Sequence, residues 1–322
     1  MKQRLLRTKV QTDTQKFPIE LRNALSSVVG LRSSVPNDAF TAGILGTERA
    51  GYGAVIRNSG LVLTIGYLTA EAETIWIIPA DGRTFPGHVL AYDFETGFGL
   101  VQILERVDLP AIALGQSEKA EVGDQIIVAG SGKDAQTLIA SIVARQEFAG
   151  YWEYALDDAI FTAPAHPNWG GTAVINLAGE LIGIGSLLVQ SADQDDETPD
   201  INMVVPVDIL KPRLEALLKS GHSGREPRPW LGVYATEVSN HVVIMGVAPR
   251  GPASDCDLRQ GDIVLDVSGE DVNSLGGFYR RIWELGPAGV EVPLQILRDN
   301  QPREITIKSG DRAAFLKSPA LH

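Results

Sequence analysis

Histidine is scarce in this 322-residue chain, with five residues, and the group of side chains best suited to a nucleophilic hydrolase surrounds Trp169. His166 lies three positions before this tryptophan, and Thr172 lies three positions after it. Asp93 and Glu95 are the carboxylates considered with them. In such a hydrolase an imidazole takes the proton of a hydroxyl, and a carboxylate orients the imidazole. One hypothesis is therefore a threonine nucleophile, and the competing interpretation is that His166 and Asp93 are ordinary loop and turn residues.

Metal and thiol chemistry have less support in the sequence. The five histidines show no ligand spacing such as HxxxH, so we expect no catalytic metal. Cys256 is the only cysteine, which excludes an intrachain disulfide and a cysteine-based metal cluster. We interpret Cys256 as a small buried hydrophobic residue. No motif predicts a cofactor.

The charge of the chain argues against a nucleic-acid partner. Its formal net charge is −12, whereas phosphate binding needs concentrated Lys and Arg. Part of the negative charge lies in residues 193–197, DQDDE. We interpret this run as a solvated loop, with the binding of a cation or a basic partner as the alternative.

The N-terminal sequence does not predict export. It is basic, but it lacks the apolar core of about 7–15 residues that a secretory signal needs. No apolar run approaches the roughly 20 residues of a membrane span. We therefore expect no membrane span and a cytoplasmic location. A periplasmic location is the expectation if an export signal has been removed.

Short apolar runs between turn residues fill most of residues 24–206, for example LVLTI, TIWII, DQIIVAG and ELIGIGSLLV. Each run has the length of a strand, and Gly, Pro, Asp or Asn usually bounds it. Many short strands without alternating long helices favour a barrel or a sandwich. The first helix is expected over residues 207–218, with Asp208 as its N-cap and Pro212 in its first turn.

A second unit follows the polar, Gly- and Pro-rich residues 219–229. Strand-like runs surround one helical run in this unit. Four apolar residues recur there at helical spacing: Leu275, Phe278, Ile282 and Leu285. A chain of this length with 44% hydrophobic residues can build two domains with full cores.

Three segments of the first unit resemble the protease domain of the HtrA/Deg family. Residues 51–64 (GYGAVIRNSGLVLT) resemble GSGFIIxxxGxILT, and residues 96–103 (TGFGLVQI) resemble TDLALLKI. Residues 168–184 (NWGGTAVINLAGELIGI) resemble NSGGPLVNxxGEVIGI. The second unit resembles a PDZ domain at residues 230–233 (WLGV) and 258–264 (LRQGDIV).

The resemblance implies a mainly β fold. We expect a trypsin-like double six-stranded β-barrel followed by a PDZ domain, which is a small, partly open α/β barrel. We expect an N-terminal extension at residues 1–22 and a protease-homology domain at residues 23–220. A linker at residues 221–228 is expected to lead to the PDZ domain at residues 229–311, followed by a tail at residues 312–322.

At the positions where this family carries its catalytic groups, the sequence has other residues. The histidine position is Tyr67, a phenol with an ordinary pKa near 10 and thus a poor base. The aspartate position is Gly97, and the serine position is Trp169, which has no nucleophilic oxygen. The resemblance places an oxyanion-hole N–H at Pro167, and proline has none. These replacements predict a protein without serine protease activity.

The resemblance also assigns a peptide groove to the second unit. A PDZ domain binds an extended peptide as an added strand, and backbone N–H groups capture the terminal carboxylate. The matching loop is Trp230, Leu231, Gly232 and Val233, and the helix that bears Phe278 and Ile282 is expected to form the other wall. Arg228 can add positive charge at the carboxylate.

These features predict an inactive protease homologue that binds peptides or protein C-termini and acts as a scaffold or as a regulator, for example of an active relative. One alternative is an active HtrA-type endopeptidase for protein quality control, in which His166 and Thr172 form a relocated triad. The other is a structural subunit with an idle groove. The resemblance implies a homo-oligomer, typically a trimer. The aromatic contacts for a trimer are not identified, because Phe17 is the only aromatic residue among the first 39.

Overall fold

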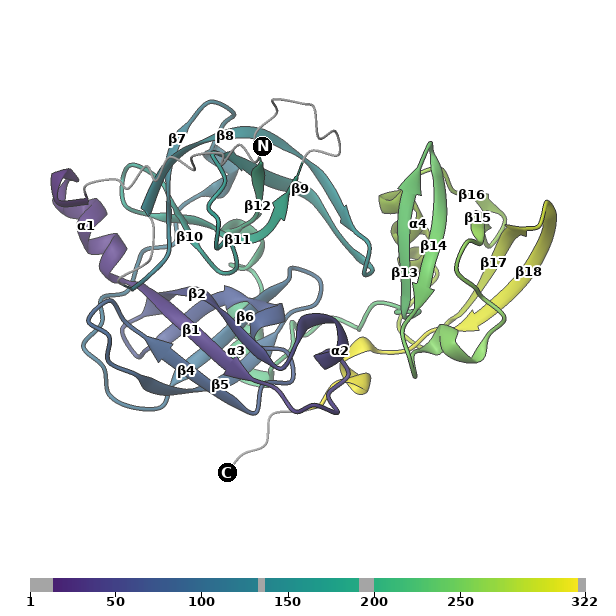
Figure 1. Ribbon diagram of the computed structural model, residues 1–322, viewed down its shortest axis with the longest axis horizontal. Coiled ribbons are helices and arrows are strands. Elements are labelled where there is room, and N and C mark those ends of the chain that lie inside the picture. The colour runs from purple at the N-terminus through teal and green to yellow at the C-terminus, as the bar shows by residue number, and fades with distance from the viewer. Residues whose placement is uncertain (1–13, 133–136, 191–199, 318–322) are drawn as a thin grey trace, which may run out of the picture.

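Two closed antiparallel barrels of six strands each form the larger part of the computed structural model, which describes residues 14–132, 137–190 and 200–317 (Figure 1). The strands of the first barrel follow one another in the order β1 (Val28–Ser34), β2 (Glu48–Arg57), β3 (Leu61–Ile65), β6 (Phe98–Ile103), β5 (Phe85–Tyr92) and β4 (Thr74–Ile78). The order in the second barrel is β10 (Ala173–Ile175), β11 (Leu181–Val189), β12 (Ile201–Pro206), β9 (Tyr154–Ala163), β8 (Thr137–Gly150) and β7 (Gln125–Ala129). The predicted double barrel is confirmed. The acidic run at residues 193–197 lies outside the described residues.

The hydrophobic pattern explains which faces the strands bury. In β4 the side chains alternate between buried and less buried positions, as expected for a strand with one face on the core. All five residues of β3 are buried, because this strand pairs on both sides and its outer face is also covered. One continuous core joins side chains of both barrels, including Leu63 and Leu100 of the first and Ile184 and Met203 of the second.

The helix predicted over residues 207–218 is wrong in its extent. The structure has a 3-10 turn, η4 (Val207–Ile209), and then a separate helix, α3 (Leu214–Ser220). Pro212 explains the break, because a proline inside a helix removes one hydrogen bond and its ring clashes with the carbonyl four residues earlier. Asp208 does not cap a helix; its carboxylate accepts a hydrogen bond from the Glu118 N–H at 2.8 Å.

The remaining helical elements of the described barrel region are short. They are η1 (Thr14–Lys16), α1 (Ile19–Ser26), α2 (Ala42–Leu45), η2 (Gly66–Leu68) and η3 (Ser117–Lys119). None of the described helices is long and apolar enough to cross a membrane.

The second unit is a sheet with one helix packed on it, as the PDZ resemblance predicts. The strand order is β13 (Val233–Val238), β14 (His241–Val247), β15 (Ile263–Val267), β17 (Glu291–Arg298) and β18 (Gln301–Lys308), and β16 (Glu270–Asp271) pairs with β15. The helix is α4 (Leu275–Glu284), whose N-cap Ser274 accepts a hydrogen bond from the Gly277 N–H. The short turn η5 (Pro252–Asp255) belongs to the same unit, and the turn η6 (Arg312–Phe315) follows it. Cys256 is partly buried against this core.

Two connections fix the small domain against the barrels. The β8–β9 hairpin extends from the second barrel to the small domain, where both of its strands contact α4 (Figure 1). On the other side, the Trp230 ring lies 5.8 Å from Phe40 of the first barrel and 5.0 Å from Phe315 of η6. The region after β18 therefore returns to the first barrel, where the Lys317 N–H donates to Glu71 at 3.0 Å.

Candidate functional site

Two of the positions that the resemblance assigns to the triad meet between the barrels. Tyr67 lies in η2, directly after β3, and Trp169 lies in the loop before β10. The Tyr67 hydroxyl donates a hydrogen bond to the carbonyl oxygen of Ser186 in β11 at 2.8 Å. Burial raises the pKa of Tyr67 well above its ordinary value, and the adjacent Trp169 side chain opposes this rise only in part. This phenol therefore cannot accept a proton near neutral pH.

Gly97, the position assigned to the aspartate, lies next to the same turn. Its carbonyl oxygen accepts a hydrogen bond from the Gly66 N–H at 2.7 Å. Its φ of +81° lies in the left-handed region that favours glycine. A Cβ at this position would lie 3.0 Å from the hydroxyl oxygen of Tyr154, which donates to the Thr96 carbonyl oxygen at 2.7 Å. A tyrosine of β9 thus fills the space beside Gly97.

Two N–H groups of the loop around Pro167, those of Asn168 and Gly171, donate to partners within the protein. Residue 167 has no N–H to offer, because it is proline. The Asn168 N–H donates to Nδ1 of His166 at 3.2 Å. The Gly171 N–H donates to the Gly185 carbonyl oxygen at 2.8 Å. These three positions therefore offer no donor to an oxyanion.

The residues of the relocated-triad hypothesis each contact other groups. The Thr172 hydroxyl donates to the backbone carbonyl oxygen three residues earlier, at 3.0 Å. His166 is completely buried, with Nδ1 facing the backbone of its own loop. Asp93 and Glu95 both lie within 4.0 Å of the Arg213 guanidinium, at 3.4 and 2.9 Å. None of these contacts is a nucleophile–base or base–carboxylate pair.

A cavity of about 490 Å³ lies between the barrels and the small domain. Tyr67, Pro167 and Trp169 line it on the side of the barrels, and Gly232 and Val233 line it on the side of the small domain. Trp169 is only partly buried, so it faces this cavity and does not fill it. Three of the four positions singled out in the sequence thus share one cavity with the loop of the peptide groove.

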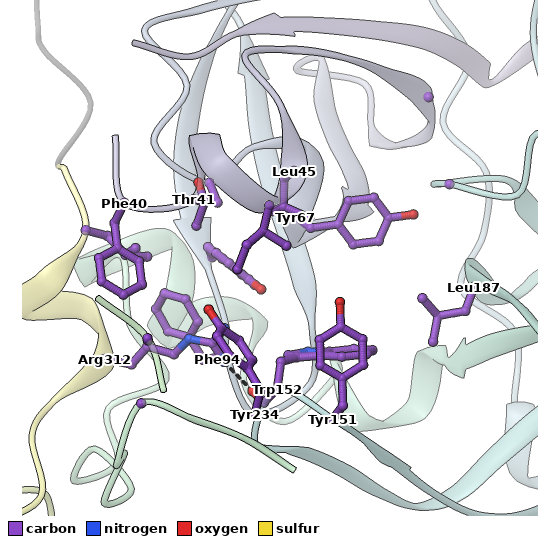
Figure 2. Close-up of a pocket in the computed structure, with 18 of the residues that line it drawn as sticks. Phe40, Thr41, Leu45, Tyr67, Phe94, Tyr151, Trp152, Leu187, Tyr234 and Arg312 are labelled. Carbon is purple, nitrogen blue, oxygen red and sulfur yellow. Dashed lines mark hydrogen bonds between the residues drawn. The ribbon is translucent and has the colours of Figure 1, made fainter. Parts of the chain in front are cut away.

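Aromatic side chains dominate the walls of this cavity. Figure 2 shows Tyr67 on one side and Tyr151 with Trp152 on the other. Arg312 is the only charged residue among the described residues of the lining, which include no His, Ser, Cys, Asp or Glu. Such a lining suits apolar and aromatic groups and includes no ordinary general base. Its one aliphatic hydroxyl belongs to Thr41 and donates to the Glu71 carboxylate at 2.6 Å, with no imidazole beside it in the described lining. The aromatic residues are Phe40, Tyr67, Tyr92, Phe94, Tyr151, Trp152, Trp169, Trp230 and Tyr234.

The loop before β13, the start of β13 and α4 carry the residues predicted for peptide binding, but several of these side chains are buried. Phe278 and Ile282 are both 0% exposed and pack in the core of the small domain. The side chain of α4 that reaches across the groove is Tyr279, whose hydroxyl donates to the Gly150 carbonyl oxygen at 2.8 Å. Trp230 is buried, with its ring against Phe40 and Phe315 as described above.

The three N–H groups predicted to hold a peptide carboxylate converge on a carboxylate of this chain. Leu231 N–H donates to Oε2 of Glu153 at 2.9 Å, and Gly232 N–H donates to Oε1 at 2.7 Å. Val233 N–H also donates to Oε1, at 2.9 Å. Glu153 is 7% exposed, and burial raises its pKa to about 7, although the N–H groups and Arg312 lower it.

Sequence reasoning missed Glu153, Tyr279 and Arg312. A single glutamate between aromatic residues carries no signal, and its partners lie about 80 positions later in the chain. Arg228, proposed for the carboxylate, instead lies 3.5 Å from Glu95 and stacks on Trp283. The cation that lowers the pKa of Glu153 is Arg312, at the start of η6. The sequence around Arg312 has no motif or periodicity that would have indicated this role.

Comparison with protein families identifies both units. The model described as "Trypsin-like peptidase domain" matches residues 51–184, and that described as "PDZ domain" matches residues 229–309. The chain is 27% identical to a probable periplasmic serine endoprotease DegP-like of Halomonas elongata over 81% of its own length. It is 28% identical to the periplasmic pH-dependent serine endoprotease DegQ of Escherichia coli over 85% of its length. It spans 56% and 63% of the lengths of these relatives.

Solved structures show the same fold. The HtrA-type protease AlgW with a decapeptide has a TM-score of 0.55 and 21% identity, covering 94% of this chain and 98% of the other. The serine endoprotease from Yersinia pestis has a TM-score of 0.55 and 22% identity, covering 91% and 96%. At this level of identity, the likeness concerns the arrangement of the two barrels and the PDZ domain.

Proposed function

We propose that this chain, which belongs to the HtrA-type family of trypsin-like serine proteases with a PDZ domain, is a catalytically inactive member that binds peptides or proteins. Its partners are extended peptides or protein C-termini that enter the PDZ groove. Through such partners it acts as a scaffold or as a regulator of an active relative.

The composition of the cavity between the barrels and the PDZ domain carries this proposal. A serine protease needs a hydroxyl nucleophile, an imidazole base and a carboxylate around one point. The described lining has Tyr67 and Trp169 where the family resemblance places the base and the nucleophile, and no His, Ser, Asp or Glu beside them. The residue at the assigned aspartate position, Gly97, has no side chain, and Tyr154 fills the space next to it.

The geometry of the PDZ loop supports the binding half of the proposal. Three consecutive N–H groups of Leu231, Gly232 and Val233 point to one site, and a carboxylate fits this site at hydrogen-bonding distance. Such backbone nests recognise the terminal carboxylate of a peptide. The adjoining strand β13 is an edge strand, so its outer edge can pair with an added strand.

Peptide capture tests this proposal. Short synthetic peptides with a free C-terminal carboxylate are expected to bind the immobilised chain, and the same peptides with a C-terminal amide are expected not to bind. Gly232→Trp should abolish the capture, because φ is +74° at this position and an added Cβ would lie 3.2 Å from the Cα of Gly251 and from the Trp230 ring, so the loop that presents the N–H groups must shift. Gly269→Trp is the matched control: its φ is +82° and no atom lies within 4 Å of its added Cβ. Equal capture of acids and amides would contradict the proposal.

A further inference from the structure

The β8–β9 hairpin ends in residues 150–153, which we call the hairpin tip, and this segment is hydrogen-bonded to the loop before β13 on one side and to α4 on the other, where the predicted peptide groove lies. We propose that the hairpin tip is an internal ligand of the PDZ domain, with the Glu153 side chain in the seat of a peptide's terminal carboxylate. A partner with a free C-terminal carboxylate then binds by displacing the tip. This inference rests on the proposed peptide-binding function, because it concerns the regulation of the same groove.

The carboxylate seat is fully used by Glu153. Oε1 accepts from Gly232 and Val233, and Oε2 accepts from Leu231, so both oxygens are engaged. Hydrogen bonds between a carboxylate and several N–H groups are stronger than those between neutral groups. A second carboxylate cannot enter while these three donors are occupied, since each N–H has one proton to donate. Glu153 and an incoming terminal carboxylate therefore compete.

One backbone hydrogen bond joins the tip to the edge of β13 where a peptide would add. The Ala235 N–H on the outer edge of β13 donates to the Tyr151 carbonyl oxygen at 3.0 Å. On the tip this contact lies two residues before Glu153, and on the strand it lies two residues after Val233. Residues 151–153 form a turn, so the tip occupies this edge without forming a paired strand. It combines a backbone contact at the strand edge with a carboxylate in the nest of N–H groups, the two kinds of contact that peptide recognition by strand addition uses.

Contacts with α4 hold the hairpin from the other wall. The Tyr279 hydroxyl donates to Gly150, the first residue of the tip. The Arg280 guanidinium forms an ion pair with Glu147 of β8 and another with Asp157 of β9, the latter at 2.9 Å. Both pairs are largely exposed, so each contributes little on its own. The contacts of the tip itself therefore hold the hairpin against the small domain more than these ion pairs do.

Two features of Glu153 make the tip displaceable. Its φ of +57° lies in the left-handed region, which is costly for any residue with a Cβ. Its charged form is also disfavoured by burial, which raises the pKa to about 7, although Arg312 and the three N–H groups lower it. Release of the tip relieves both costs. A terminal carboxylate at the end of a flexible peptide has no such backbone constraint.

The test compares wild type with Glu153→Gln, which keeps the size of the side chain. Because both oxygens accept N–H bonds, either orientation of the new amide places an NH₂ group against at least one donor. The affinity for a peptide with a free carboxylate, taken from the capture above, is expected to rise by about ten-fold or more, since a closed fraction lowers the apparent affinity. Glu215→Gln, an exposed change on α3, is the control and should leave the affinity unchanged.

Hydrogen exchange of the Leu231, Gly232 and Val233 amides supplies a second readout that needs no peptide. These amides are expected to exchange about ten-fold faster in Glu153→Gln, because they lose their acceptor. Unchanged exchange rates would contradict the proposal that the tip is an internal ligand. Equal peptide affinities of the variant and the wild type would also contradict it, but would leave the proposed peptide binding intact. Faster exchange with no peptide bound to either protein would support the seating of Glu153 and refute the proposed function.

Discussion

The triple variant Tyr67→His, Gly97→Asp, Trp169→Ser is expected to hydrolyse casein no faster than buffer, although it contains all three side chains of the triad. Two obstacles remain. Pro167 provides no N–H to the oxyanion, and one missing donor costs about 2.7–4 kcal/mol of transition-state stabilisation. An aspartate at residue 97 requires a left-handed backbone and a Cβ 3.0 Å from the Tyr154 hydroxyl. The carboxylate therefore cannot take a position that orients the new histidine.

The expected loss of turnover in the triple variant is large enough to be measured clearly. The missing oxyanion-hole donor lowers turnover by about 10²–10³-fold, and loss of the aspartate's orienting role lowers it by about 10⁴-fold. Hydrolysis by the triple variant at a rate near that of Escherichia coli DegQ, measured in parallel, would refute the roles given to Pro167 and Tyr154. The variant with Trp169→Ser alone serves as the control for folding, which circular dichroism can follow.

Gly171→Ala is expected to cause the largest loss of stability of any single methyl addition to the cleft. Its φ is +78°, and an added Cβ would lie 1.9 Å from the Tyr52 carbonyl oxygen, which belongs to the backbone of β2. The loop and β2 are also joined by the Tyr52 N–H, which donates to Gly170 at 2.9 Å. The loop cannot yield without separating the two barrels here. We expect a loss of about 4 kcal/mol or more, read from the urea midpoint.

Gly82→Ala separates the steric effect from the backbone effect. Gly82 is exposed, has a φ of +83° and has no atom within 4 Å of its added Cβ. It therefore suffers only the left-handed backbone cost, which is about 1–2 kcal/mol. Similar urea midpoints for the two variants would mean that the loop and β2 are not packed as described.

The architecture could be predicted from the sequence because its signals are local. Each short apolar run is bounded by turn residues, and most runs became strands in the expected order. The strand β9 carries a weaker signal of this kind, because its sequence YALDDAIFTA interrupts the apolar pattern with Asp157 and Asp158. The helix α4 was found because its apolar spacing is helical and Ser274 caps it. Where a proline interrupted such spacing, at Pro212, the sequence pattern alone overestimated the helix.

The candidate site could be predicted only in part, because its residues come from distant segments. The resemblance led to Tyr67, Gly97, Pro167 and Trp169, and three of them line one cavity. It also led to the N–H groups before β13. The occupant of that nest could not be foreseen, since the length of the β8–β9 hairpin and its direction decide what its tip reaches.

The absence of proteolysis is the central claim, and turnover of the wild-type chain tests it most directly. The purified protein is incubated with casein and separately with a fluorophosphonate probe, which labels activated serine and threonine hydroxyls. We expect intact casein and an unlabelled protein, because the cavity presents an indole and buried phenols to the substrate. Casein cleavage that accompanies labelling of this chain, and that is lost on changing Thr172 or His166, would contradict the account.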